Sequence, residues 1–238
     1  MIDRRIRQNA GQACAIRLRL YERSKKVIFR YVKQLGVALM LLGSLLSAGS
    51  ARAQDEAADV FIKRMSTEVL DVIKADKSMR SGDIAKVVTL VDTRIMPHVD
   101  FQRMTASAIG PGWRQATPEQ QKRLQEEFKI LLVRTYAGAL SQISDQVIAL
   151  KPLRAAPEDK EVVVRSEVRG SGEPIQLDYR LEKTPGQGSG WRIFNINVMG
   201  VWLVETYKSQ FAQEINAKGV DGLIESLAAR NKSNSKKN

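Results

Sequence analysis

The only histidine of the chain, His98, is the residue whose type best suits acid–base chemistry near neutral pH. A Ser–His–Asp hydrolase would need it as the general base, beside a serine nucleophile and a carboxylate. Its neighbours Pro97 and Val99, followed by Asp100, instead place it in a turn ahead of a helix. We therefore interpret His98 as a turn residue and predict no catalytic residue in this chain.

Metal and nucleotide sites have no recognisable motif in this sequence. Cys14 is the single cysteine, so the Cys and His pairs that hold zinc are missing, and no D-x-[DN]-x-[DN]-G calcium loop occurs. The glycine-rich segment 186–190 falls between two predicted strands, where a hairpin loop is expected, whereas phosphate-binding loops join a strand to a helix. The P-loop motif G-x-x-x-x-G-K-[ST] is also absent. We expect neither a metal nor a cofactor.

The positive charge of the chain is concentrated at its two ends. The formal net charge is +12, and residues 1–53 hold 11 of the 38 Lys and Arg but only two of the 26 Asp and Glu. Residues 54–229 contain 23 basic and 24 acidic residues, and the remaining four basic residues lie in 230–238. Aromatic residues make up only 6%, which is few for a protein that stacks on bases. These numbers disfavour nucleic acid as a partner.

Residues 1–53 have the organisation of a secretory signal peptide. Basic residues precede an apolar run of 12 residues, 35–46, which is shorter than the roughly 20 residues of a membrane span. The small residues Ala51 and Ala53 then form an A-x-A site, and this predicts cleavage after Ala53 in preference to an uncleaved anchor. The part before Val27 is long for a signal peptide, so we interpret it as an N-terminal extension upstream of the true translation start.

Cleavage at this site has a consequence for the compartment. It removes Cys14, which leaves a mature chain without any thiol. Export combined with an absence of cysteine is typical of a protein of the bacterial periplasm. A chain of about 185 residues is long enough to fold without disulfide bonds.

Residues 54–229 are predicted to form a single domain that begins and ends with helices. Apolar residues at helical spacing predict a helix over 56–75 and a long one that begins at Pro118, behind an N-cap Thr117 and with Gln120 at position N3. Ser81 is expected to cap a short second helix and Asp100 a third over 101–109. Gly200 is expected to begin a helix that Gly219 ends, and a last helix is expected to follow, with Leu223, Ile224 and Leu227. Residues 230–238 read as a disordered basic tail.

Between these helices, alternating apolar and polar residues predict strands over 146–153, 161–169, 175–183 and 191–198. In 175–183 the apolar side chains, Leu177 and Tyr179 among them, point to one face, and the polar ones, including Asp178, point to the other. One dry and one wet face are typical of an antiparallel meander. We therefore predict an α+β fold, in which a curved antiparallel sheet of about four strands is covered by helices and encloses an apolar pocket.

Large, flexible or aromatic side chains recur on the faces that are predicted to point inward. The same pattern describes a filled core and a hollow one, so the residue pattern leaves both possibilities open. If a pocket exists, its lining is expected among Phe101, Met104, Phe128, Leu132, Tyr136, Leu177, Tyr179, Phe194, Val201, Val204, Tyr207 and Phe211.

Two blocks of sequence carry a family signature. In residues 95–140 it consists of Pro97, Asp100-Phe101, Met104, Gly110, Trp113-Arg114, Thr117-Pro118-Glu119-Gln120, Glu127-Phe128 and Tyr136. In residues 191–227 it consists of Trp191, Gly200-Val201, Leu203-Val204, Tyr207, Gln210-Phe211 and Gly219. With these residues the chain resembles the MlaC, or toluene-tolerance, family. It departs from the family at Asn195, where an acidic residue is frequent, and at Trp202, where a small residue is frequent and where we expect the large ring to lie beside the pocket.

The resemblance implies a phospholipid-binding protein of the periplasm. Proteins of this family carry lipid between the outer and inner membranes for an ABC transporter that maintains the lipid asymmetry of the outer membrane. The implied partners are phospholipid, an inner-membrane ABC transporter complex and an outer-membrane lipoprotein–porin complex. The twelve residues named above are then the expected lipid-binding residues, and no enzymatic activity is expected. We also expect binding to depend on the acyl tails more than on the head group, because the strand face with Leu177 and Tyr179 has no cluster of Lys or Arg.

Two alternatives stay open at this point. One is a small enzyme on a cone-shaped α+β fold, with Asp178 or Tyr179 as an acid or base in the cavity; the expected position of Asp178 on the wet face disfavours it. The other is a periplasmic adaptor or scaffold that binds no lipid and has a filled core.

Overall fold

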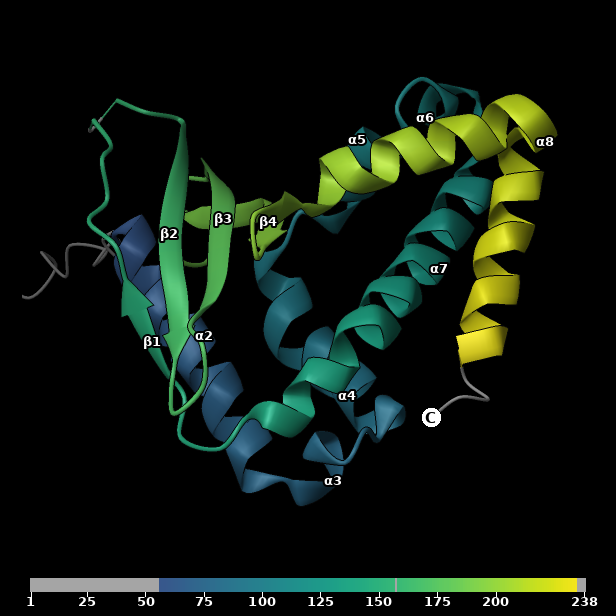
Figure 1. Cartoon of the computed structure of the whole chain (residues 1–238). Helices are drawn as coiled ribbons and strands as arrows, with labels where there is room; N and C mark the ends of the chain where they lie inside the picture. The colour runs from purple at the N-terminus through teal and green to yellow at the C-terminus, as the bar shows by residue number, and fades with distance from the viewer. Residues whose placement is uncertain (1–55, 157, 235–238) are drawn as a thin grey trace, which may run out of the picture. The chain divides into compact units, whose positions relative to one another are not determined.

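The computed structural model describes residues 56–156 and 158–234, which belong to one structural unit (Figure 1). The predicted signal peptide, its cleavage site after Ala53 and the last residues of the predicted tail, 235–238, lie outside the described residues. Among the described residues, no helix is both long enough and apolar enough to cross a membrane.

The first half of the described chain is helical. Short 3-10 and π segments connect its α-helices, so that the chain turns several times within about 85 residues. The elements are α2 (Ala58–Ala75), α3 (Lys77–Arg80), α4 (Ile84–Leu90), the π-helix η1 (Val91–Ile95), the 3-10 helix η2 (Met96–His98), α5 (Phe101–Ile109), α6 (Gly112–Gln115), α7 (Pro118–Tyr136) and the 3-10 helix η3 (Ala137–Gln142).

Side-chain caps set the start of several of these helices. The predicted capping box is confirmed, because the Thr117 hydroxyl accepts the Gln120 N–H at 3.2 Å and the Gln120 side chain accepts the Thr117 N–H at 2.9 Å. Asp100 caps α5 by accepting the Arg103 N–H at 2.9 Å, also as predicted. The prediction that Ser81 caps a helix was wrong. Ser81 ends α3, and Asp83 caps the next helix by accepting a backbone N–H of α4.

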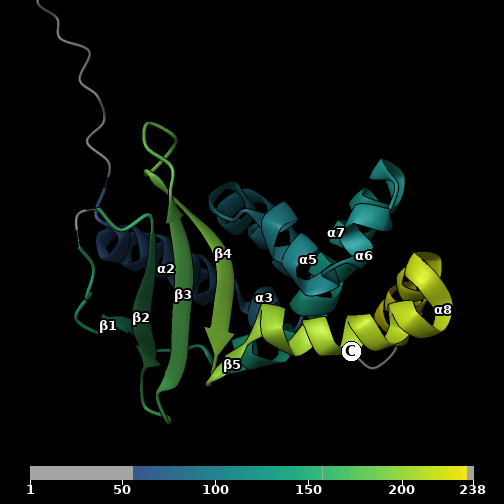
Figure 2. The same cartoon turned by 90° about the horizontal axis from the view of Figure 1, so that it is seen from above.

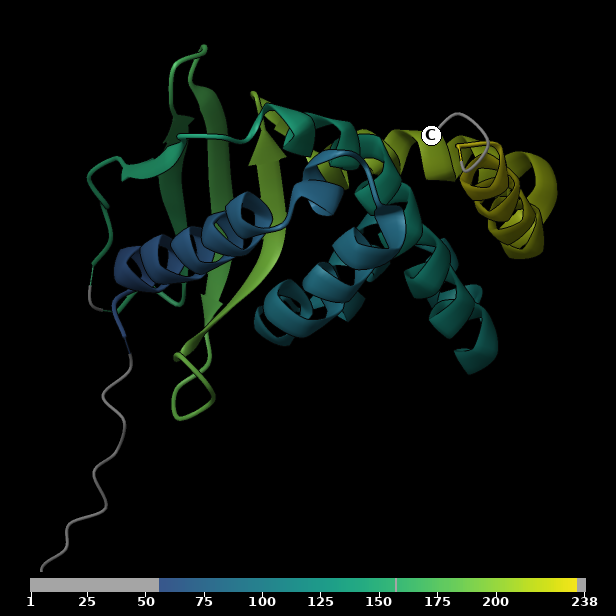
Figure 3. The same ribbon diagram turned by 90° about the horizontal axis from the view of Figure 1, so that it is seen from below.

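The strands form one antiparallel sheet in the order β1-β2-β3-β4-β5, which confirms the predicted α+β class. Helix α2 crosses one face of the sheet, and α5, α7 and α8 lie on the β4 side of it (Figures 2 and 3). The sheet has five strands instead of about four because a two-residue strand follows β4 in a tight hairpin. Their bounds are β1 (Val147–Leu150), β2 (Glu161–Arg169), β3 (Ile175–Lys183), β4 (Trp191–Val198) and β5 (Val201–Trp202).

The last helix, α8 (Leu203–Asn234), begins and ends later than predicted. Met199 (φ 53°) and Gly200 (φ 87°) turn the chain back, so that Val201 pairs with β4 and the helix can start only at Leu203. Gly219 (φ 71°) kinks α8 at the position where the sequence predicted a helix end. Helix α8 then continues to Asn234, beyond the expected domain boundary at residue 229.

A buried side-chain contact attaches the last turns of α8 to α7. The Asn231 side chain is buried, and its amide donates to the Glu127 carbonyl oxygen at 3.0 Å and to the Glu127 carboxylate at 2.8 Å. The beginning of the predicted tail is therefore fastened to α7.

The main core lies where α5, α7 and α8 meet. Phe128 is fully buried there, and its ring centroid lies 5.8 Å from that of Phe101, 5.0 Å from that of Tyr207 and 5.3 Å from that of Phe211. Aromatic pairs at these separations add to the stabilisation from burial. This cluster packs α8 against one face of α7. A different face of α7 takes no part in the cluster.

Candidate functional site

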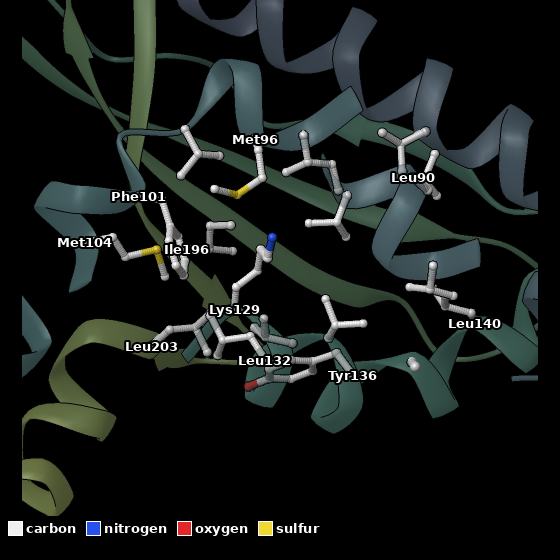
Figure 4. Close-up of a pocket in the computed structure, with 18 of the residues that line it drawn as sticks. Leu90, Met96, Phe101, Met104, Lys129, Leu132, Tyr136, Leu140, Ile196 and Leu203 are labelled. Carbon is white, nitrogen blue, oxygen red and sulfur yellow. The ribbon is translucent and has the colours of Figure 1, made fainter. Parts of the chain in front are cut away.

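A cavity of about 260 Å³ opens between the helices and the inner side of the sheet (Figure 4). Its wall is assembled from α2, α4, η1, η2, α5, α7, η3 and β4, together with Val99 and the first residue of α8. Every lining residue except Lys129 and Tyr136 has a purely hydrocarbon or thioether side chain, within the part of the chain that the structure describes. The cavity is therefore suited to an apolar ligand.

Helix α7 provides one wall through the spacing of its residues. Lys129, Leu132, Val133 and Tyr136 stand at i, i+3, i+4 and i+7, so they share one face of the helix and all line the cavity. The face with Phe128 belongs to the core described above. Helix α7 thus separates a filled region from a hollow one.

The π-helix η1 forms the opposite wall. Val91 and Ile95 of η1 line the cavity, and Leu90 at the end of α4 and Met96 at the start of η2 extend this wall. π-Helices are rare in proteins, and those that occur are often found at functional sites. No lining residue was predicted in this segment, since its apolar residues at i, i+1, i+5 and i+6 do not follow the α-helical period. That irregular spacing is the signal that could have revealed the segment.

The sheet wall is narrow and comes from β4. Ile196 and Val198 line the cavity, while the buried Asn195 and Asn197 alternate with them and point to the opposite face. Leu203, the first residue of α8, continues this wall beyond β5.

The polar groups of the cavity are few. The Lys129 ammonium donates to the Asp92 carboxylate at 2.7 Å, and the side chains of Lys129 and Asp92 are 24% and 43% exposed, so this pair lies near solvent. Burial raises the pKa of the Tyr136 phenol, and nearby Tyr207 raises it further, so the phenol stays protonated at neutral pH. In residues 56–156 and 158–234, no cluster of three or more His, Cys, Asp or Glu has an arrangement that could hold a metal ion.

Four of the twelve residues that were predicted to line a pocket do so: Phe101, Met104, Leu132 and Tyr136. The remaining eight lie elsewhere, on elements that also contribute to the cavity wall or support it.

Four of these eight residues lie on α7 or α8 and are buried or packed between helices. Phe128, Tyr207 and Phe211 form the aromatic cluster between α7 and α8. Val204 is only 8% exposed and packs into the same core.

The other four are on the strands. Leu177 and Tyr179 lie on the inner side of β3, where the Tyr179 hydroxyl is 3.3 Å from the Ser66 hydroxyl of α2 and burial raises the pKa of the phenol. The Phe194 ring lies 3.7 Å below the Arg103 guanidinium. Val201, in β5, is 46% exposed.

The expected wet position of Asp178 was wrong, because Asp178 is only 4% exposed. One carboxylate oxygen accepts from the Gln176 amide at 2.7 Å, and the other, Oδ1, finds no hydrogen-bond partner among the described residues. Asp178 pairs across the strands with Asn197, and Asn197 pairs with Trp202, whose ring lies 4.0 Å from the Arg180 guanidinium. Neighbouring side chains therefore cover this face of the sheet.

The positions of Asp178 and Trp202 bear on two expectations. The cavity lining includes neither residue, because both belong to the sheet face opposite Ile196 and Val198. The expected position of Trp202 beside the pocket was therefore wrong. Asp178 and Tyr179, the two candidate acid or base residues, point to opposite faces of β3.

Comparisons with known proteins agree with the family signature. A family model described as MlaC protein matches residues 63–229. The toluene tolerance protein ttg2D of Pseudomonas putida is 29% identical over 162 residues, which cover 67% of this chain and 74% of that protein. The intermembrane phospholipid transport system binding protein MlaC of Haemophilus influenzae is 23% identical over 168 residues, which cover 69% of this chain and 78% of that protein.

A solved structure is also similar. It is that of the phospholipid-binding protein from Ralstonia solanacearum in complex with a phospholipid, and it has a TM-score of 0.71 and 49% sequence identity over 75% of this chain and 98% of that chain. The family match extends over more than half of the chain and includes all the cavity-lining residues. This chain therefore belongs to the MlaC protein family.

Proposed function

We propose that this protein binds phospholipid and carries it through the periplasm between the outer and inner membranes, for an ABC transporter that maintains outer-membrane lipid asymmetry. The observation that carries this proposal is the cavity, whose lining is apolar apart from Lys129 and Tyr136. The phospholipid in the Ralstonia solanacearum structure and the name of the Haemophilus influenzae relative support the same ligand.

The physical need for such a carrier follows from the acyl tails. Each buried methylene group is worth about 0.8 kcal/mol, so exposing two tails with some thirty methylenes costs on the order of 20 kcal/mol. A free phospholipid crosses water too slowly to be useful. A protein that buries the tails and leaves the charged head group near solvent removes most of this cost, and it needs no catalytic residue to do so.

The size of the cavity fits this role when its side chains can adjust. Its volume of about 260 Å³ is just below the range of about 300–1,000 Å³ that is usual for ligand sites. Met96 and Met104 are in the wall, and unbranched methionine side chains adapt readily to the shape of a ligand. We infer that the wall moves outward when tails enter.

We further propose the partners and the location that this role requires. An inner-membrane ABC transporter complex and an outer-membrane lipoprotein–porin complex would exchange lipid with the protein. The N-terminal 53 residues would direct export and be removed, so that the mature chain begins at Gln54.

The main test is the lipid content of the purified protein. The protein is expressed from the full chain, purified without detergent and extracted with organic solvent, and the phosphorus and the mass spectrum of the extract are measured. We expect about one phospholipid for each protein, and its mass should not change on incubation, because no enzymatic reaction is proposed. A protein that contains no phospholipid and takes up none from vesicles would refute the proposal.

The location is tested separately. Osmotic shock should release the protein, and N-terminal sequencing should begin at Gln54. A protein that stays with the membrane after a high-salt wash and retains residues 35–46 would contradict the signal-peptide interpretation.

A further inference from the structure

Lys129 is the only cationic side chain in the lining of the cavity, within the described residues. Figure 4 shows its side chain extending from α7 into the space between the lining residues, with the nitrogen at its tip. An ammonium group in an otherwise apolar wall is costly to keep unless it has a partner, and here Asp92 supplies one at 2.7 Å.

The geometry places this ion pair at the edge of the cavity. Asp92 follows the lining residue Val91 in η1, and its own side chain is 43% exposed. Lys129 is less exposed, at 24%, and precedes the lining residue Leu132 by one helical turn. The pair therefore spans the boundary between the apolar interior and solvent, where the head group of a lipid with buried tails has to lie.

We propose that Lys129 and Asp92 form a head-group site that favours a zwitterionic phospholipid with a primary ammonium group over an anionic phospholipid. This inference rests on the proposed function and adds a selectivity to it.

The reason is the match between two pairs of charges. Phosphatidylethanolamine carries a phosphate that can accept from Lys129 and an ammonium that can donate to Asp92, so both protein charges keep a partner. Phosphatidylglycerol offers the phosphate and uncharged hydroxyl groups but no cation, so the Asp92 carboxylate lies near a second negative charge without a positive partner. Because both side chains are partly exposed, solvent weakens the effect, and we expect a preference of about threefold to fivefold.

A preference of this size is compatible with binding that depends mainly on the tails. It also predicts opposite effects for the two members of the pair. Asp92→Asn removes the repulsion of phosphatidylglycerol together with the partner of the ethanolamine group, so the preference should fall. Lys129→Met removes the phosphate partner and leaves the carboxylate, so the preference should rise while total binding decreases.

A suitable control pair lies elsewhere in the chain. Lys151 and Glu167 form an ion pair of the same length, 2.7 Å, and neither residue lines the cavity. Lys151→Met therefore removes one positive charge and one surface ion pair without touching the proposed site. Lys129→Arg keeps the positive charge at the site, so it should retain a preference for phosphatidylethanolamine that Lys129→Met alters.

The experiment loads each delipidated protein from vesicles of equal parts phosphatidylethanolamine and phosphatidylglycerol with identical acyl chains. Bound lipid is extracted, its total is measured as phosphorus, and the ratio of the two lipids is measured by mass spectrometry. Circular dichroism checks that each variant is folded. A parallel arm adds inorganic phosphate to the loading mixture, which should not change the ratio, because the tails hold the head group in place.

The proposal is supported by a wild-type preference that Asp92→Asn lowers and Lys129→Met raises, with Lys151→Met unchanged. Full loading with the same ratio in all variants would overturn the head-group site and leave phospholipid binding intact. Loss of the preference on addition of phosphate alone would also overturn it, since the site would then hold a free anion. No lipid in any protein, wild type included, would refute the proposed function and this inference with it.

Discussion

The separation of filled core from hollow cavity can be tested with one substitution made at two positions, Val204→Asp and Val198→Asp. Val204 is 8% exposed and packs in the core at the start of α8, whereas Val198 is partly exposed and lines the cavity on β4. The pattern of apolar residues predicted Val204 in the lining, whereas the structure places it in the core, so the two substitutions test which placement is right. We expect Val204→Asp to unfold the protein and Val198→Asp to remove the lipid only.

The magnitude at Val204 follows from two contributions. Loss of the buried valine costs about 2 kcal/mol. A carboxyl group in the core avoids its charge by staying protonated, and at pH 7 this costs about 4 kcal/mol, given an ordinary pKa of about 3.9. The first turn of α8 would favour a negative charge by no more than about 1 kcal/mol, which is too little to keep the buried carboxyl ionised. The loss of about 6 kcal/mol is comparable to the whole stability of a typical domain, about 5–15 kcal/mol.

The two variants should also differ in their pH dependence. Burial raises the pKa of a carboxyl in the folded state, so the penalty is absent below the unfolded pKa and grows as the pH rises towards the folded pKa. Relative to the wild type, Val204→Asp should therefore recover about 2.7 kcal/mol when the pH falls from about 7 to about 5. The Val198→Asp carboxylate reaches water in the cavity, so its stability relative to wild type should stay nearly constant over this range.

The assay is urea unfolding followed by circular dichroism at both pH values, with lipid extracted from the same samples. Equal destabilisation and equal pH dependence at the two positions would refute the conclusion that water reaches Val198. A Val204→Asp protein that is fully stable at pH 7 but free of lipid would show that Val204 lines the pocket, and Val204 would then not belong to the filled core.

Three further predictions concern the supporting structure. Thr117→Ala should lower the free energy of unfolding by about 1 kcal/mol in urea, because it removes the hydrogen bond to the Gln120 N–H; an unchanged midpoint would contradict the cap. Gly219→Ala should cost about 1 kcal/mol because φ is 71°, whereas Gly138→Ala, at a glycine that has no positive φ, should cost little; equal losses would argue against backbone strain. Burial and the nearby Arg64 charge lower the pKa of His98, so stability should fall as the pH drops through the ordinary histidine value of about 6.5, and His98→Gln should reduce this loss; an unchanged pH profile would exclude His98 as its source.

Helix starts were predictable where one residue dominates the capping. Asp100 and Thr117 each precede a clear apolar pattern, and both cap as predicted. Around Ser81 several residues can cap, and the choice depends on how the short helices pack. The Asp76 carboxylate caps α3 and also accepts from Lys86 of α4 at 2.9 Å, a contact that local sequence does not reveal. Burial of Met79 and Val87 in one cluster fixes the same arrangement.

The start of α8 was not predictable from local pattern. Apolar residues at helical spacing continue back to Val201, and the turn at Met199-Gly200 lacks the Asn-Gly or Asp-Gly pair that usually indicates a hairpin. Pairing with β4 decides the conformation, since two residues of β5 give their hydrogen bonds to the sheet before the helix begins.

The lining of the cavity was predictable only in part, because a pattern of apolar residues does not distinguish contact with a neighbour from contact with a hollow. Phe128 and Leu132 of α7 both satisfy the helical period, yet one is fully buried against α8 and the other lines the cavity. Which face meets a partner depends on how far α7 stands from β4, and that distance is a property of the tertiary structure.

Two polar residues of β4 hold the start of α8, and they face away from the cavity. The Asn195 amide oxygen accepts the Val204 N–H of α8 at 3.2 Å, and its amide nitrogen donates to the Glu205 carboxylate at 2.7 Å. Asn197 accepts the Gly200 N–H at 2.8 Å and so closes the hairpin that leads into α8. Both asparagines are almost fully buried, where unmade hydrogen bonds would be costly. They attach the start of α8 to β4, and because Leu203 lies at this junction, the position of the cavity wall is set by side chains that a ligand never contacts.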